Sequence, residues 1–310
     1  MDKEMFTSQL KGRLEELTGC KVNSQTSTKN NGVKLESLVI MREGVNAAPT
    51  IYADIWWELY NAGEPFEDIV TKVLEWERKI SINRRIDFDF FLDFNKVKGN
   101  LRFKVINTEK NLDLLNTIPH KDFMDLSKVY YVEVYTPEMG TGTILVSNAH
   151  MENWGADLEE IDRYATGQTE GHNPFQIFDM KDITKSVAME MAGMVKEEKN
   201  FQTDMEIPHV EMPPRQMYVF TNEQRYFGAS VLLYQDILKN FAKQIRDNLV
   251  ILPSSTHELI VVPAGVAGYT GINHLKEMVK TVNATQVEPE EYLSDNVYFY
   301  NKGTGRLKII

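Results

Sequence analysis

The chain has 310 residues, of which 42% are hydrophobic and 25% charged, and its formal net charge is −11. This is the composition of a globular protein with enough apolar surface for one or two domains without disulfides. The longest basic run is Arg84–Arg85. Because phosphate binding needs clustered Lys and Arg, we expect no nucleic-acid partner.

The single cysteine, Cys20, excludes an internal disulfide and fits a reducing compartment. The N-terminal segment MDKEMFTSQLKGRLEEL is amphipathic and lacks a cationic segment followed by an apolar run, so it does not read as a signal peptide. No stretch approaches the roughly 18 apolar residues that a membrane span needs. We therefore expect a cytoplasmic protein without a membrane partner.

The first part of the chain predicts a helix, a hairpin and two further helices. Apolar residues repeat with helical spacing over residues 4–18, and Asn30, Asn31 and Gly32 favour a tight turn between two strands. The segment ADIWWELYNA predicts a short helix that ends at Gly63, and a second helix follows Pro65.

The middle of the chain predicts helix, then hairpin, then helix. Residues 86–118 read as mostly helical, and KVYYVEVY and GTILVSN then form a hairpin. Asp157 is suited to cap a helix that begins after it. Residues 195–215 are charged, proline-bearing and aperiodic, which indicates a linker or long surface loop. It would separate an N-terminal α+β region, 1–194, from a C-terminal one, 216–310, with packing as one domain as the alternative.

Residues 216–264 predict short strands and a helix that follow one another with few residues between them. MYVFTN, GASVLLY, DILKNFAKQIRDN, LVILP and ELIVVPA predict the order strand, strand, helix, strand, strand. After them we expect a flexible glycine-bearing connection over 264–271, a helix over 272–282 and a closing hairpin. Residues 130–166 and 217–247 both read as strand, turn, strand, helix, so two ββα-type halves are one interpretation, and coincidence between common motifs is the other. The predicted fold class is α+β, with antiparallel hairpin sheets covered by amphipathic helices.

The connection between the last two of these strands carries the side chains closest to a catalytic set: Ser254, Ser255, His257 and Glu258. A serine hydrolase needs a hydroxyl, an imidazole and a carboxylate in mutual contact. On an extended segment Ser255 and His257 share one side while Glu258 points to the other. No G-x-S-x-G motif is present. A polar turn is therefore favoured over a reaction centre.

Other motifs predict neither a cofactor nor a metal. Gly265, Gly268 and Gly271 lack the lysine and spacing of a phosphate loop. Asp87, Asp89 and Asp93 alternate with phenylalanines and lack the rest of a calcium loop. The six histidines form no H-x-x-x-H motif, and with one cysteine we expect no zinc site.

Two aromatic groups are candidate binding surfaces. Trp56 and Trp57 lie about 100° apart around a predicted helix. Exposure of one of them beside Tyr60 would form an interface patch, whereas partial burial of both between helix and sheet is favoured. His150 and Trp154, which follow a predicted strand, are a weaker candidate, and a hydrogen-bonded structural histidine is favoured there.

The segments GASVLLYQDILKNFAKQIRDNLVILPSSTHELIVVP, PTIYADIWWELYNAGEPFEDIV and LSDNVYFYN together resemble a bacterial family known only as a domain of unknown function. The resemblance covers nearly the whole chain. It implies a cytoplasmic α+β protein of anaerobic Gram-positive gut bacteria, often encoded on mobile elements. It implies no activity, cofactor or catalytic residue.

From these observations we expect a non-enzymatic binding or accessory protein that acts through protein–protein contacts. A hydrolase or transferase that uses Ser255 and His257 is the first alternative. An acidic decoy of a nucleic-acid-binding protein is the second.

Overall fold

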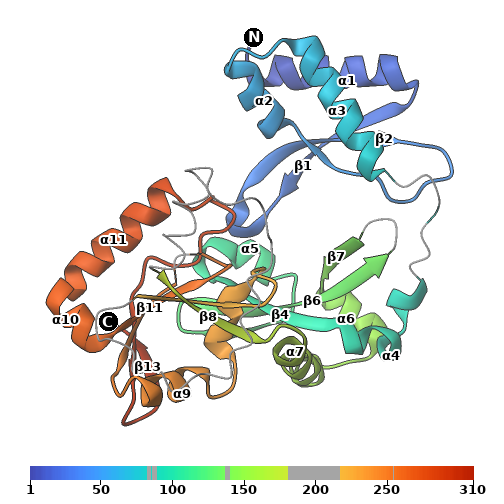
Figure 1. The fold of residues 1–310 in the computed structure, drawn as a ribbon. Helices are drawn as coiled ribbons and strands as arrows, with labels where there is room; N and C mark the ends of the chain where they lie inside the picture. Colours follow the sequence, from blue (N-terminus) through green and yellow to red (C-terminus); the bar gives the residue numbers. More distant parts are fainter. Residues whose placement is uncertain (82–84, 86–88, 137–139, 181–216, 254) are drawn as a thin grey trace, which may run out of the picture.

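A computed structural model describes residues 1–81, 85, 89–136, 140–180, 217–253 and 255–310. Within them the strands form three sheets, and every strand pair is antiparallel. Helices pack on these sheets (Figure 1). The predicted α+β class is confirmed.

The N-terminal unit, residues 3–80, has its own sheet and core. Its elements are α1 (Lys3–Thr18), β1 (Lys21–Thr28), η1 (Asn30–Gly32), β2 (Lys34–Met41), β3 (Ile51–Tyr52), α2 (Ala53–Asn61) and α3 (Phe66–Ile80). The side chains of Phe6, Leu10 and Leu14 on α1 are fully buried, in one cluster with those of Ile69 and Val73 on α3. The three helices predicted here are confirmed. They are stable because their apolar stripes cover one small sheet.

The β1–β2 hairpin extends from the N-terminal unit to the rest of the molecule (Figure 1). Asn31 and Gly32 at its tip adopt left-handed backbone conformations, with φ of 61° and 68°, as the Asn-Gly turn predicted. The amide of Asn31 donates to the backbone carbonyls of Pro289 and Tyr292, and its main-chain N–H donates to the side chain of Asn111. The hairpin tip is therefore fixed to two other parts of the chain.

The second sheet has β6 at its centre, paired with β4 on one side and with β5 and β7. Its part of the chain contains η2 (Asp89–Leu92), α4 (Phe94–Val97), η3 (Lys98–Asn100), β4 (Leu101–Asn107), η4 (Glu109–Asn111), α5 (Leu112–Leu115), β5 (His120–Phe123), β6 (Leu126–Thr136), β7 (Gly140–Leu145), α6 (Asn148–Trp154) and α7 (Leu158–His172).

The prediction that residues 86–118 are mostly helical is wrong where β4 forms. A short apolar run fits a helix and a strand equally well, and only pairing decides between them. Leu101 pairs with Val132 and Asn107 with Leu126, so β4 is a full-length partner of β6. The predicted β6–β7 hairpin and the cap of α7 by Asp157 are confirmed; Asp157 accepts a hydrogen bond from the Glu160 amide.

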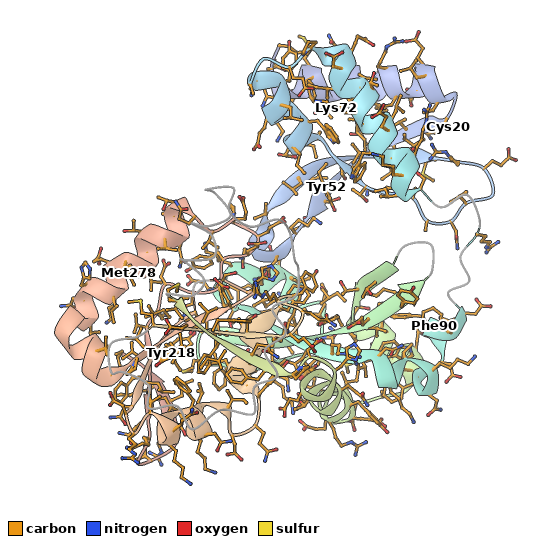
Figure 2. All side chains as sticks on the ribbon, in the orientation of Figure 1. Cys20, Tyr52, Lys72, Phe90, Tyr218 and Met278 are labelled. Atoms are coloured by element: carbon orange, nitrogen blue, oxygen red, sulfur yellow. The ribbon has the colours of Figure 1, made fainter. Side chains whose placement is uncertain are left out.

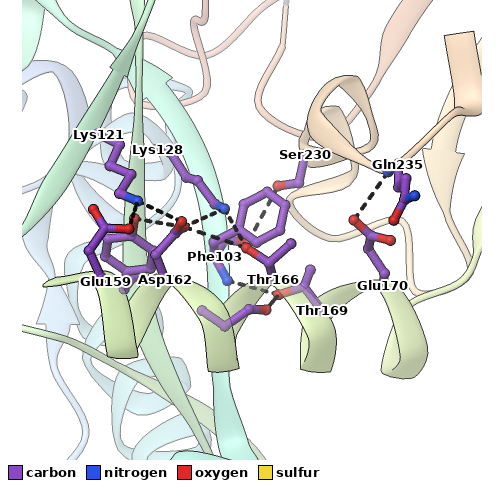
Figure 3. Close-up of polar contacts among 12 residues, drawn as sticks. Phe103, Lys121, Lys128, Glu159, Asp162, Thr166, Thr169, Glu170, Ser230 and Gln235 are labelled. Carbon is purple, nitrogen blue, oxygen red and sulfur yellow. Dashed lines mark hydrogen bonds and ion pairs between the residues drawn. The ribbon is translucent and has the colours of Figure 1, made fainter.

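Helix α7 covers one face of this sheet and one edge of β4 (Figure 3). The main-chain N–H of Phe103 donates to Thr169 Oγ1 at 2.9 Å, and its carbonyl accepts from Ser230 at 3.5 Å. On the covered face, Lys128 Nζ lies 2.5 Å from Asp162 Oδ1. The two hydrogen bonds to Phe103 satisfy backbone groups that would otherwise be free at the edge of β4.

The third sheet has the strand order β13-β12-β10-β11-β9-β8. Its part of the chain contains β8 (Phe175–Asp179), β9 (Tyr218–Asn222), η5 (Gly228–Leu233), α9 (Ile237–Gln244), β10 (Leu249–Leu252), β11 (Leu259–Pro263), α10 (Ala264–Thr270), α11 (Ile272–Thr285), β12 (Tyr298–Asn301) and β13 (Arg306–Ile309). The predicted closing hairpin is β12–β13.

Two predictions for this region are wrong. Gly228–Leu233 of the predicted strand GASVLLY form the 3₁₀ segment η5 instead, because Gly228 packs directly against β9 and the His257 carbonyl. The second supposed ββα half therefore lacks one strand, and the duplication is not present. In place of the expected flexible connection over 264–271, Ala264–Thr270 form helix α10 and Gly271 follows it. The predicted linker, 195–215, lies outside the described residues.

The second and third sheets share one hydrophobic cluster, which contains Phe103 and Tyr130 as well as Phe220 and Tyr298. The Asp125 carboxylate joins them further: it accepts hydrogen bonds from Ser294, Asn296 and Tyr298. Side chains fill the space between these sheets (Figure 2). Over the described residues, none of the helices combines the length and apolar character needed to cross a membrane.

Candidate functional site

The predicted polar connection between β10 and β11 has the following geometry. The Ser255 hydroxyl accepts a hydrogen bond from the main-chain N–H of His257 at 3.1 Å, and Glu258 is exposed. Ser254 lies outside the described residues. Ser255 thus bonds to the backbone of His257 and not to its ring, which is the local bonding that Ser favours in turns.

Both nitrogens of the His257 imidazole have partners. Nδ1 accepts a hydrogen bond from the main-chain N–H of Phe227 at 3.2 Å, and Nε2 lies 3.2 Å from the Glu291 carboxylate. In the neutral ring an accepting Nδ1 leaves the proton on Nε2, where it can face Glu291. The imidazole therefore positions the loop before η5.

That loop is strained and closely fitted. Arg225 and Phe227 have left-handed backbones, with φ of 53° and 52°, which non-glycine residues seldom adopt. The Asn222 side chain accepts from the Tyr226 N–H at 3.3 Å and donates to its carbonyl at 2.9 Å. A Cβ atom on Gly228 would lie 2.0 Å from Thr221 Oγ1. Strained non-glycine residues held by such contacts often mark functional sites.

The loop places its aromatic rings beside a lysine of β4. Lys104 Nζ lies 4.1 Å from the centroid of the Phe227 ring, and Phe227 also contacts Tyr226 at 4.0 Å and Tyr131 at 5.5 Å. We call Lys29, Lys104, Tyr131, Tyr226 and Phe227 the Lys104 site. Lys104 is partly buried, and among the residues that the structure describes no carboxylate lies within ion-pair distance of it.

The electrostatic environment of Lys104 disfavours its proton. Burial, and to a smaller extent the charge of Lys29, lowers the pKa of Lys104 to about 8. Lys29 comes from the N-terminal hairpin, where its ammonium lies 4.3 Å from the centroid of the Tyr52 ring. Tyr52 lies on the side of the N-terminal unit that points towards the rest of the chain (Figure 2). Parts of all three sheet regions thus meet at this site.

The tryptophan pair is partly buried. Trp57 stacks on Tyr60 with 5.6 Å between ring centroids and also contacts Phe6 of the N-terminal core. Trp56 contacts Trp76 of α3 edge to face at 6.5 Å. Partial burial of both rings between helices and sheet agrees with the favoured interpretation. Ile55 on α2 is 59% exposed, and Trp76 and Ile80 on α3 are 36% and 42% exposed.

His150 and Trp154 have structural contacts. His150 Nδ1 accepts from the Ser147 N–H at 3.1 Å and completes the cap of α6. Trp154 Nε1 donates to the Phe91 carbonyl at 2.7 Å, and the Phe91 ring packs on His150 at 5.0 Å. These contacts fix α6 against η2.

Within the described parts of the chain, no three His, Cys, Asp or Glu side chains gather in a way that could hold a metal ion. Asp93 caps α4 by accepting from the Asn95 N–H at 3.0 Å.

Sequence reasoning missed Lys104. The sequence places this lysine in the middle of the apolar run LRFKVIN. Its position in a sheet becomes evident only once the run is known to be strand β4. Sequence reasoning also missed Tyr226 and Phe227. They lie between β9, which was correctly predicted as a strand, and η5, which was wrongly predicted as one.

Comparison with protein families gives one match: a model described as a family of unknown function, DUF5688, matches residues 3–302. The chain belongs to this family. The match agrees with the resemblance to a domain of unknown function over nearly the whole chain. No curated protein and no solved structure matches the chain.

Proposed function

We propose that this protein is a non-catalytic binding protein that holds an anionic group of its ligand at Lys104. The observation that carries this proposal is a partly buried ammonium on a rigid strand, over an aromatic ring, with no carboxylate partner among the described residues. Removing an ammonium from water is unfavourable unless an opposite charge compensates it. A ligand anion would supply that charge.

Lys128 in the neighbouring strand shows the usual arrangement. It is also buried and contacts an aromatic ring, Phe103 at 4.2 Å, but Asp162 lies 2.5 Å from its ammonium. The two lysines lie on opposite faces of one sheet, each over an aromatic ring, and of the two Lys128 has a carboxylate within ion-pair distance among the described residues. This contrast favours a ligand-binding role for Lys104 over a purely structural one.

The contacts of His257 favour binding over the hydrolase or transferase alternative. Both ring nitrogens are engaged, by Phe227 and Glu291, and the Ser255 hydroxyl accepts from the His257 backbone. A general base needs a free nitrogen facing the nucleophile. Here the imidazole serves to hold the aromatic wall of the Lys104 site.

The test is a titration of the full chain with two matched probes, benzoate and phenyl phosphate, by calorimetry at pH 7.5. Lys104→Met is expected to lose binding of both probes. Lys110→Met is the matched control, because Lys110 also lies over an aromatic ring, 3.6 Å from the Tyr292 centroid, but is exposed. Equal affinities in wild type and Lys104→Met, or no binding of either probe to wild type, would show that the proposal is wrong.

A protein partner is the second candidate, and exposed apolar side chains of α2 and α3 favour it. Ile55 is 59% exposed, Trp76 36% and Ile80 42%. We propose that a partner protein contacts this face. A stoichiometric partner, purified after capture, should lose affinity for the Ile55→Ser, Trp76→Ser double variant. It should keep its affinity for Met41→Ser, which removes an exposed side chain elsewhere in the N-terminal unit.

We also propose that the protein is cytoplasmic and comes from a gut bacterium, and that its gene lies on a mobile element. The family resemblance supports these three points. The net charge of −11 supports the acidic decoy more weakly, because an acidic balance also serves solubility.

A further inference from the structure

We propose that strand β1 pairs with β1 of a second copy of the chain, antiparallel and with Thr26 of one copy opposite Thr26 of the other. The proposal concerns the edge of the N-terminal sheet and is independent of the Lys104 site. The two N-terminal sheets would then join into one continuous sheet. An exposed edge strand is a ready template for pairing of this kind.

Strand β1 is the first strand of its sheet and, among the described residues, pairs with β2 alone (Figure 1). Two backbone N–H groups show which of its residues point away from β2. The N–H of Lys29 donates to the Val33 carbonyl across the hairpin, so it points towards β2. The N–H of Val22 donates to the Glu15 carboxylate at 2.9 Å, so it points away. The two observations agree, because these directions alternate along a strand and the two residues are an odd number of positions apart.

By the same alternation, Ser24, Thr26 and Thr28 direct their backbone N–H and carbonyl groups away from β2. In the part of the chain that the structure describes, these groups form no hydrogen bond, and all three residues are exposed. The free groups are centred on Thr26. A two-fold axis at Thr26 pairs Ser24 of each copy with Thr28 of the other, and no other antiparallel register pairs all of them.

Strand β1 lacks the features that protect two other sheet edges. At the edge of β4, the Phe103 N–H and carbonyl are occupied by two side chains. At the end of the third sheet, β13 has 4 residues and exposes Arg306 and Lys308. Short and charged edge strands oppose pairing with another chain. Residues 23–28 of β1 contain neither a charge nor a proline, so this edge is open to pairing.

The charges at the two ends of β1 favour a second copy as its partner. Glu15 of α1 lies at the Val22 end, and Lys34 of β2 is opposite Thr28 at the other end. Both lie on the face that α1 covers, because Val22 packs in the α1 cluster and Thr28 shares its face. Among the described residues neither Glu15 nor Lys34 forms an ion pair. In the antiparallel pair, Lys34 of each copy is at the same end as Glu15 of the other, so opposite charges meet at both ends.

Sedimentation equilibrium of the full chain over a range of concentrations measures the dimer. Its dissociation constant should be on the order of 10–100 µM, because pairing of one strand covers less surface than a standard interface. Thr26→Pro removes the N–H at the centre of the paired strands and should weaken the dimer by about tenfold or more. Proline is tolerated in an edge strand where the N–H faces solvent, so urea unfolding of this variant should match that of Thr26→Ala. Thr26→Ala keeps the N–H and should dimerise within about threefold of wild type.

A charge exchange tests the antiparallel arrangement. Lys34→Glu alone and Glu15→Lys alone should each dimerise about tenfold more weakly than wild type, because like charges then meet at both ends. An equimolar mixture of the two variants should recover the affinity of wild type, since each end of the mixed dimer again has one positive and one negative side chain. A wild type that stays monomeric, a dimer that Thr26→Pro leaves unchanged, or a mixture no tighter than the single variants would each overturn the proposal.

Discussion

The imidazole of His257 lies parallel to the ring of Phe227, with 5° between the planes and 5.9 Å between the centroids, and its Nδ1 accepts a hydrogen bond from the Phe227 amide. One residue thus fixes both the ring and the backbone of the other. Because Phe227 has a left-handed backbone, this pair of contacts offsets a conformation that is unfavourable by itself.

Replacement of His257 should therefore loosen the aromatic wall of the Lys104 site. We expect His257→Ala to lower the free energy of unfolding by about 1–3 kcal/mol, because the Phe227 N–H loses its acceptor. Benzoate affinity should fall with it. Urea unfolding measures the first effect and calorimetry the second. His274→Ala is the control, since His274 is exposed on α11. A His257 variant as stable as this control would contradict the positioning role.

Gly228 should tolerate no side chain. A Cβ there would meet Thr221 Oγ1 at 2.0 Å and the His257 carbonyl at 2.3 Å, both in the sheet that supports the loop. Gly228→Ala should lower the free energy of unfolding by about 1–3 kcal/mol through overpacking. Gly167 of α7 has open space around its Cβ position, so Gly167→Ala should instead stabilise by about 0.5–1 kcal/mol. Thermal and urea unfolding of the two alanine variants should move in opposite directions.

Lys104 should reduce stability at neutral pH. Its folded-state pKa of about 8 lies below its ordinary value of 10.5, so the folded state binds this proton less well than the unfolded state. The penalty is complete below pH 8 and disappears as the pH rises towards 10.5. Lys104→Met should therefore raise the free energy of unfolding at pH 7 by on the order of 1–3 kcal/mol.

The gain from Lys104→Met should shrink between pH 8 and pH 10. Urea unfolding at both pH values measures it, and Lys128→Met, which leaves Asp162 without its closest ammonium, should destabilise instead. A Lys104→Met variant less stable than wild type at pH 7 would contradict a strained, uncompensated lysine.

Asp162 should give the opposite pH dependence. Burial alone would raise its pKa, but hydrogen bonds from Lys128 and Lys121 outweigh burial and hold the pKa below its ordinary value (Figure 3). A carboxylate with a lowered pKa stabilises the fold above pH 4, and that contribution is lost as the pH falls through the folded-state pKa. Asp162→Asn should thus destabilise at pH 7 by about 2–4 kcal/mol.

The difference between wild type and Asp162→Asn should narrow at pH 3. Urea unfolding at pH 7 and pH 3 provides the comparison. Asp113→Asn is the control, because Asp113 is exposed on α5 and its change should be at most about 0.5 kcal/mol. A constant difference at both pH values would mean that the carboxylate charge does not contribute.

Local patterns were sufficient wherever one segment could bury its own apolar face. The stripe of Phe6, Leu10 and Leu14 predicts α1, and the Asn31–Gly32 turn predicts the β1–β2 hairpin; both are present because their contacts are close in sequence. The same holds for the cap of α7 by Asp157. The polar turn at Ser255 was also recognised, since its hydroxyl bonds to backbone two residues away.

Where the partner of a segment was far away in sequence, the same reasoning failed. The run at Leu101–Asn107 is a strand only because β6 pairs with it, and Gly228–Leu233 is a 3₁₀ segment only because Gly228 packs on β9 and the His257 carbonyl. Sequence reasoning failed to predict the Lys104 site for the same reason. Lys104 and Phe227 are more than a hundred positions apart, and Lys29 comes from a third region.

The sequence by itself determined the α+β class, most helices and hairpins, and the lack of a complete catalytic or metal motif. Tertiary structure decided that Lys104 is partly buried with no carboxylate within ion-pair distance among the described residues, because burial and ion pairing depend on distances that only folding sets.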